Sequence, residues 1–251
     1  MNLILHIKLE TSPAQHAKLL ELQAAFAEVC NALAPVVQQT GCWNRVALHH
    51  LAYRRMRQQF PALGSQMICN AMYSVSRASR WVYQHPSSPF NVQKLAGRPL
   101  PRLQFLQQSP VYFDRHTLSL RDGVASMYTL DGRIRFNLPL APVDEQRFRT
   151  ARLREIVLLC RDGQFQLSFT FGDSAEPATA SQALPLGGEA AVMSAPAILP
   201  ADNELPHYLL VLQAAASSGG PTAPVLLPAR APASPSTRPL PADPTFVQTA
   251  P

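Results

Sequence analysis

The sequence has few cysteines, and they are far apart. Cys30, Cys42, Cys69 and Cys160 form no C-x-x-C pair and lie near no His cluster. Zinc sites need closely spaced ligands, and disulfide frameworks are typical of small secreted domains, so neither is predicted. We expect four reduced, mostly buried thiols in a cytoplasmic protein, with no metal and no other cofactor.

Long hydrophobic runs and a basic leader are also missing. The first ten residues, MNLILHIKLE, contain a short apolar run that an acidic residue follows at once. This pattern predicts a strand over residues 3–9 and not a signal peptide. No apolar stretch approaches the roughly 20 residues that span a bilayer, so no membrane association is predicted.

Acidic residues are scarce in the first two thirds of the chain. Residues 1–172 contain 20 Lys/Arg against 10 Asp/Glu, whereas residues 173–251 contain 2 against 6. The overall charge of +6 therefore conceals a strongly basic body. A field of this sign favours polyanionic partners such as RNA, DNA or an anionic surface.

Three helices are predicted between residues 11 and 86. The first begins with Ser12 as N-cap, Pro13 at the first helical position and Gln15 completing a capping box, and Pro35 is expected to end or kink it. The second begins near Asn44 and stops at Pro61; the third runs over residues 63–83. Together they predict a small antiparallel bundle.

A period of two replaces the helical period after residue 101. Residues 87–101 form a Pro/Ser/Gly connector, and residues 102–172 alternate between apolar runs and the turn dipeptides Asp114-Arg115, Asp122-Gly123, Asp131-Gly132 and Asp162-Gly163. These features predict an α+β fold: a small antiparallel β-barrel from residues 1–10 and 102–172, with the bundle inserted after its first strand.

The remaining residues, 173–251, have little periodicity. They hold 14 of the 24 prolines, and only residues 207–216 have a short helical pattern. Such a Pro/Ala-rich segment buries too little apolar surface to offset its ordering entropy, so we expect a disordered tail.

Three segments together resemble a known family. They are Y-x-D-R-x-x-L-S-L-R-D-G from Tyr112, L-D-G-R-I-R-F-x-L from Leu130 and C-R-D-G-x-F-x-L-x-F from Cys160. With the preceding strand and helices, they resemble the N-terminal half of TnpB-type (OrfB-family) proteins, which are transposon-encoded RNA-guided nucleases related to type V CRISPR effectors. The resemblance covers about residues 3–172.

The resemblance implies a wedge domain for the barrel and a recognition domain for the helices. In the family these domains hold a structured guide RNA and read a short motif beside the double-stranded DNA target. The RuvC nuclease half would follow with a G-x-D-x-G strand, later carboxylates and a four-cysteine zinc ribbon, but none occurs after Phe171. Cleavage by two metal ions needs such carboxylates, so no catalytic residue is predicted and the chain is not expected to be an enzyme.

The third helix carries the candidate base-reading residues. Gln66 matches the base-reading Gln of the family, and a helical Gln pairs well with adenine. Asn70 is a weaker candidate one turn later, and Asn44 is either a base contact or, more simply, an N-cap. Ala62 stands where the family often has Lys, which leaves the recognised motif open.

Basic residues predict a phosphate-binding surface. Alternation places Arg133 and Arg135 on one face of their strand, opposite Ile134 and Phe136. Tyr112 and Tyr128 are candidates for stacking on bases, although packing is the simpler role. His49 and His50 are adjacent in a helix and point about 100° apart, and no carboxylate lies nearby in sequence, so neither a shared metal ion nor an acid/base pair is predicted. The candidate phosphate contacts are Arg54, Arg55, Arg57, Arg77, Arg80, Lys94, Arg98, Arg133 and Arg135.

The sequence thus predicts a nuclease-deficient TnpB-like protein that binds guide-type RNA and, through it, DNA. Such a protein is expected in the cytoplasm, associated with the nucleoid when it is bound to DNA. Three alternatives stay open: one half of a split nuclease whose RuvC half is a separate chain, a transposon remnant without function, and an unrelated basic RNA-binding barrel.

Overall fold

The chain begins with a strand and a capped helix, as predicted. In the computed structural model, which describes residues 3–172 and 205–212, these residues belong to one compact unit. Strand β1 (Leu3–Lys8) leads into helix α1 (Pro13–Thr40). Ser12 Oγ accepts from the Gln15 amide at 3.3 Å, and Gln15 Oε1 accepts from the Ser12 amide at 2.9 Å. The predicted capping box is therefore confirmed.

Helix α1 is longer than predicted and forms the centre of the fold. It continues through Pro35 to Thr40 and ends at Gly41, which adopts a left-handed conformation with φ of 64°. By length and composition α1 alone among the described helices is apolar enough to cross a membrane, but 56% of that stretch is buried within the protein. It is a core helix whose buried side chains include Leu19, Leu22, Phe26, Val29, Cys30 and Leu33.

Two further helices pack against α1 and complete the predicted bundle. They are α2 (Arg45–Gln59) and α3 (Ser65–Gln84), and each contacts the other as well as α1. Asn44 Oδ1 accepts from the amides of Val46 and Ala47 at 2.9 and 3.2 Å. The simpler reading of Asn44 as an N-cap is therefore confirmed. After α3, the connector runs as a series of turns over residues 85–101.

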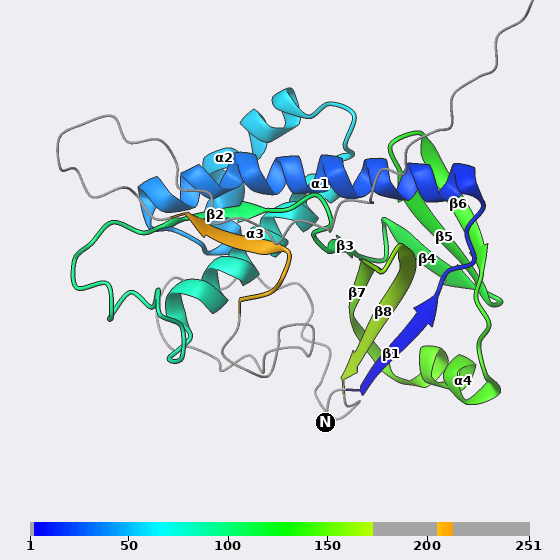
Figure 1. Cartoon of the computed structure of the whole chain (residues 1–251). Coiled ribbons are helices and arrows are strands. Elements are labelled where there is room, and N and C mark those ends of the chain that lie inside the picture. The colour runs from blue at the N-terminus through cyan, green and yellow to red at the C-terminus, as the bar shows by residue number, and fades with distance from the viewer. Residues whose placement is uncertain (1–2, 173–204, 213–251) are drawn as a thin grey trace, which may run out of the picture. The chain divides into compact units, whose positions relative to one another are not determined.

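The strands form three antiparallel sheets (Figure 1). The first has the order β1-β8-β7-β3, so β1 lies beside a strand that is more than 150 residues away in sequence. The second is β4-β5-β6 and the third pairs β2 with β9. Their bounds are β2 (Arg102–Phe105), β3 (Val111–Phe113), β4 (Leu118–Arg121), β5 (Val124–Thr129), β6 (Gly132–Asn137), β7 (Arg152–Arg161), β8 (Gln164–Gly172) and β9 (Leu209–Leu212).

Among the described residues, none of these sheets closes into the predicted barrel. The chain passes from one sheet to another at the turn that follows β3. Asp114 Oδ1 accepts from the amides of His116 and Thr117 at 3.1 and 3.0 Å, which is an Asx turn. This turn carries the chain from the first sheet to the second, so β3 and β4 do not pair as a hairpin.

Two of the predicted Asp-Gly turns form as expected. Asp122 and Gly123 have φ of 47° and 73° between β4 and β5, and Asp162 and Gly163 have φ of 50° and 75° between β7 and β8. Positive φ at both positions is the type I′ turn that favours Asp-Gly. Between β5 and β6, Thr129 pairs with Gly132, so the turn comprises Leu130 and Asp131 and the glycine follows it.

Two elements differ from the prediction. Residues 209–212 form strand β9 on β2, whereas a disordered tail with only a short helical pattern over 207–216 was expected, so this part of the presumed tail is ordered. A short helix, α4 (Pro142–Thr150), was not predicted because none of its residues is fully buried and no apolar period marks it. The rest of the predicted disordered tail, residues 173–204 and 213–251, lies outside the described residues.

A row of amide side chains anchors α1 to the rest of the fold. Asn31 both donates to the Phe105 carbonyl and accepts from the Phe105 amide, so it occupies one edge of β2. Successive members of the row are seven or eight residues apart, about two turns, so the anchors are spread along the length of α1. The four donors and their carbonyl acceptors are Gln15 to Arg135 at 3.3 Å, Gln23 to Ser109 at 3.0 Å, Asn31 to Phe105 at 2.8 Å and Gln38 to Leu100 at 3.0 Å.

Candidate nucleic-acid interface

One long segment of the chain contains no carboxylate side chain. The 85 residues from Val29 to Phe113, here the acid-free segment, hold nine Lys/Arg and no Asp or Glu. They include the end of α1, all of α2 and α3, the connector, β2 and β3. Comparing the charge of residues 1–172 with that of residues 173–251 does not reveal this segment, because other parts of residues 1–172 do contain acids. The nine are Arg45, Arg54, Arg55, Arg57, Arg77, Arg80, Lys94, Arg98 and Arg102.

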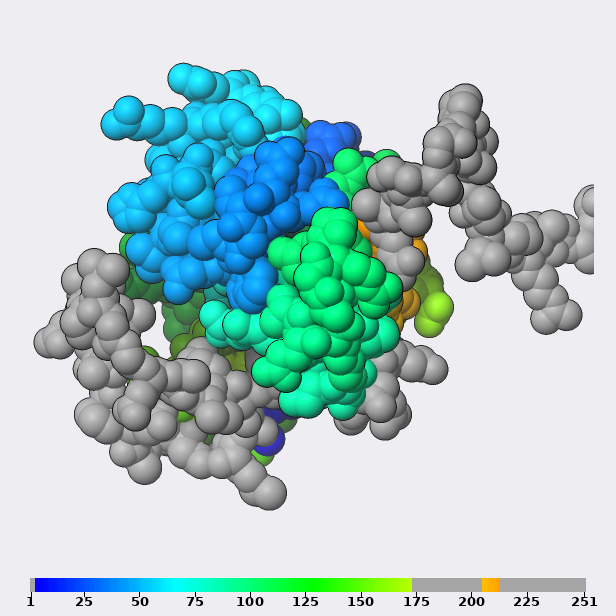
Figure 2. Space-filling model, turned by 90° about the vertical axis from the view of Figure 1, so that its left-hand side faces the viewer, coloured from blue at the N-terminus to red at the C-terminus, as the bar shows by residue number. Residues whose placement is uncertain are grey.

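Most of these basic side chains are exposed. On α2, Arg54 and Arg55 lie on the surface, and Arg45 lies 5.8 Å from the centre of the Tyr73 ring. Within the described part of the chain, no carboxylate lies within 4.0 Å of these three arginines. Figure 2 shows α2, in light blue to cyan, at the surface beside the later part of α1 and the green connector. Among the described residues, α2 and the connector carry positive charge only.

The connector holds its two cations in place through backbone carbonyls. Lys94 Nζ donates to the Pro86 carbonyl at 2.6 Å, and Arg98 Nε donates to the Leu95 carbonyl at 3.2 Å. Both side chains remain exposed, as does Arg80 on α3. The predicted contacts at these three positions are therefore sterically accessible.

Arg57 and Arg77 differ from the prediction because neither lies on an exposed arc. Arg57 is half-buried and donates to the Leu63 carbonyl, which ties the end of α2 to the loop before α3. Arg77 forms an ion pair with Glu155 on β7, and their side chains are only 11% and 6% exposed. In this structure Arg77 is not available to a phosphate, so we remove it from the predicted surface.

The Arg77–Glu155 pair belongs to a buried cluster that joins α3 to the first sheet. Tyr73 donates its hydroxyl to Glu155 at 2.9 Å, and the Arg77 guanidinium lies 5.6 Å from the centre of the Tyr112 ring. Burial, and then the negative charge of Glu155, raise the pKa of Tyr73 to about 12. Tyr112 is buried between these groups, so its predicted stacking on a base is also not supported.

Tyr128, the second tyrosine predicted to stack on a base, holds the loop between α2 and α3. Tyr128 accepts from the Gly64 amide at 2.9 Å and donates to the Ala62 carbonyl at 3.0 Å. The hydroxyl of Tyr128 on β5 thus fixes the start of α3, which is a structural role. Gln66, the second residue of α3, is half-buried and lies next to this anchored loop.

Asn70 lies inside the protein, in contrast to the prediction. Its amide nitrogen is 3.4 Å from Thr117 Oγ1 and 3.9 Å from Met67 Sδ, and the residue is buried. The prediction assumed that this polar residue of a helix faces the solvent. Asn70 instead contacts the turn between β3 and β4. Base contact by Asn70 is therefore not supported.

The outer face of the second sheet carries the other predicted arginines. Ile134 and Phe136 point inward while Arg133 and Arg135 are exposed, which confirms the predicted alternation. Arg133 crosses the neighbouring strands, where it donates to Ser126 Oγ at 3.0 Å and to the His116 carbonyl at 3.2 Å. These bonds fix its guanidinium and use part of its donor capacity.

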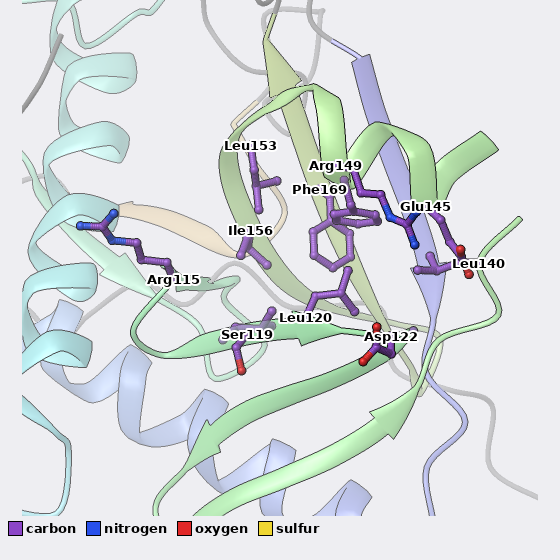
Figure 3. Close-up of a pocket in the computed structure, with 13 residues that line it drawn as sticks. Arg115, Ser119, Leu120, Asp122, Leu140, Glu145, Arg149, Leu153, Ile156 and Phe169 are labelled. Atoms are coloured by element: carbon purple, nitrogen blue, oxygen red, sulfur yellow. The ribbon is translucent and has the colours of Figure 1, made fainter. Parts of the chain in front are cut away.

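A pocket of about 390 Å³ opens between β4, α4 and the first sheet. Figure 3 shows Leu120, Ile156 and Phe169 pointing into this space, with Glu145 and Arg149 of α4 at its side. Its floor is apolar and its rim carries both signs of charge.

The structure also describes the candidate metal and thiol groups. Within residues 3–172 and 205–212, no group of three or more His, Cys, Asp or Glu side chains is close enough to hold a metal ion. All four cysteines are free thiols. Burial raises the pKa of Cys30, Cys69 and Cys160, which disfavours the thiolate form needed in a nucleophile or ligand.

Comparisons with known proteins add no family assignment. No protein-family model matches this chain, and no curated protein matches it. The resemblance to the TnpB family therefore stays a prediction that rests on the quoted residues.

Proposed function

We propose that this protein binds structured, guide-type RNA and, through that RNA, double-stranded DNA, without cleaving it. The observation that supports this most strongly is the acid-free segment, with exposed arginines on α2 and α3 and exposed cations on the connector. Each phosphate that Lys or Arg neutralises releases condensed counterions, and this release supplies much of the affinity for nucleic acids.

The RNA-guided part of the proposal rests on sequence. The segments from Tyr112 to Arg135 and from Leu159 to Phe171 resemble the TnpB family, and the G-x-D-x-G strand of its nuclease half is missing. The complex would then act by occupying DNA, as a repressor or a targeting subunit, in the cytoplasm and on the nucleoid. Base pairing would select the target and the protein would read only a short adjacent motif.

The contact surface that we propose is smaller than the one predicted from sequence. It keeps Gln66 at the start of α3 as the candidate base-reading residue, and it omits the buried Asn70, Arg77 and Tyr112. Phosphate contacts come from exposed side chains only. These are Arg54, Arg55, Arg80, Lys94, Arg98, Arg133 and Arg135.

Immunoprecipitation from the native host, followed by sequencing of the bound RNA, tests this proposal. We expect one dominant small RNA that is encoded beside the gene of this protein. The purified chain should then bind that RNA at least about tenfold more tightly than a scrambled RNA of equal length. Diffuse recovery of abundant cellular RNAs, or equal affinity for the scrambled RNA, would contradict it.

A further inference from the structure

Helix α2 carries a stack of aromatic rings on its surface. The rings of His49 and Tyr53, one turn apart, are 4.5 Å apart and inclined by 19°. His50 approaches His49 edge-on, at 5.9 Å and 88°. Both histidines are exposed and Tyr53 is half-buried. A flat, preformed ring surface therefore faces the solvent on this helix.

Helix α2 also exposes large apolar side chains to the solvent. Only Leu48, Ala52 and Met56 are buried, whereas Val46 and Leu51 are 57% and 56% exposed. Exposed apolar side chains that gather on one element indicate a binding surface more often than isolated ones do. These side chains and the ring stack lie on one short helix.

The charge around the stack limits the kind of ligand. Helix α2 has no acidic residue, and Arg54 follows Tyr53 directly and lies one turn after His50. A ligand that uses both the rings and the arginines needs a flat apolar face and a negative charge. An unpaired nucleotide has both, in its base and its phosphate.

We propose that the His49–Tyr53 stack binds an unpaired base of the bound RNA, and that Arg54 contacts an adjacent phosphate. This inference rests on the proposed RNA binding and adds the class of structure that is recognised at α2, a loop or bulge and not a continuous duplex. Stacking is tolerant of base identity, so the site would select single-stranded character and not sequence.

Binding of two RNA probes to the full chain, measured by fluorescence anisotropy, tests the inference. One probe is a hairpin with an eight-nucleotide loop, and the other is a duplex of the same total length without a loop. We expect His49→Ala to weaken hairpin binding about fivefold or more and to change duplex binding less than twofold. His49→Phe keeps a flat ring and should restore hairpin binding.

His207→Ala is the matched control, because it removes an exposed histidine that contacts Tyr208 edge-on and lies outside the acid-free segment. It should leave both affinities unchanged. If the wild type binds both probes and His49→Ala changes neither, or weakens both equally, the stacking site is wrong while RNA binding stands. If the wild type binds neither probe, the proposed function and the stacking site both fail.

Discussion

Two neighbouring regions of this protein carry the same number of cations and very different numbers of anions. The acid-free segment, residues 29–113, has nine Lys/Arg and no Asp or Glu, whereas residues 114–172 have nine Lys/Arg and seven Asp/Glu. The second region uses its acids structurally. Asp114, Asp122, Asp131 and Asp162 lie in or beside turns, Asp144 pairs with Arg147, and Glu155 pairs with Arg77.

The helices show the same contrast. Helix α4 has Asp144 and Glu145 in its first turn and Arg147 and Arg149 in its last, which suits the helix dipole. Helices α2 and α3 have no acid in their first turns. They therefore lack a stabilisation of about 0.3 to 1 kcal/mol per acid, although such residues are easy to place at exposed positions. Missing acids on α2 and α3 are expected if this surface binds polyanions, as we propose.

The largest expected effect comes from the ion pair that joins the two regions. Glu155→Ala leaves the buried Arg77 guanidinium without this carboxylate, so we expect the free energy of unfolding to fall by about 3 to 5 kcal/mol. Urea denaturation measures it. Glu145→Ala, at an exposed site on α4, is the control and should cost about 0.5 kcal/mol. A loss below about 1 kcal/mol in Glu155→Ala would contradict a stabilising pair.

The tyrosine in the same cluster predicts a loss of stability at alkaline pH. Burial and Glu155 raise the pKa of Tyr73 from 10.0 to about 12, so its neutral form is favoured in the folded state. This contribution is complete below pH 10 and is lost as the pH rises toward 12, by about 2 to 3 kcal/mol. Thermal melts from pH 9 to 12 should show a shallower decline for Tyr73→Phe. Parallel curves for variant and wild type would be evidence against the assignment.

Charge reversal compares the two regions directly. We expect the double substitution Arg54→Glu and Arg55→Glu to weaken binding of structured RNA about tenfold at 100 mM salt and to flatten its salt dependence. The matched control is Arg152→Glu with Arg161→Glu, two exposed arginines of the second region, which should change the affinity less than about threefold. Equal losses in both pairs would mean that net charge, and not the acid-free surface, governs binding.

The smallest predicted effect concerns the anchoring of β2. Asn31→Ala removes two hydrogen bonds to the backbone of Phe105 and should lower the free energy of unfolding by about 1 to 2 kcal/mol. Hydrogen exchange at the Phe105 amide should become faster. Gln39→Ala, exposed on the same helix, serves as the control. Unchanged exchange at Phe105 would show that Asn31 does not hold this strand.

Local signals in the sequence were sufficient for helices α1 to α3 and for most turns. The Ser12 capping box, the Asn44 cap and the type I′ turns at Asp122 and Asp162 each depend on a few adjacent residues. The pairing of β2 with β9 depends on contacts between residues more than 100 positions apart, and no local pattern marks it. Whether strands close into a barrel is likewise decided by pairing between distant segments.

The candidate site was predictable only where polar residues are exposed. Arg54, Arg55, Arg133 and Arg135 lie on the surface as alternation and helical period indicate. Three other candidates are not on the surface: Arg77, Asn70 and Tyr112. Each contacts a partner on another element, and the period of a helix or strand does not predict such contacts between distant residues. The ring stack on α2 was not predicted because the adjacent histidines were considered only as metal ligands or as an acid/base pair.

The amide row of α1 affects how freely the segments that it anchors can change by mutation. All four carbonyls that it binds, including those of Leu100 and Ser109, belong to the backbone, so the anchoring does not depend on which side chains those segments carry. Exposed positions there, such as Arg98, Arg102 and Gln104, are free to be substituted while the chain path is kept. A single substitution at such a position can thus change the chemistry of the surface while the backbone that presents it stays in place.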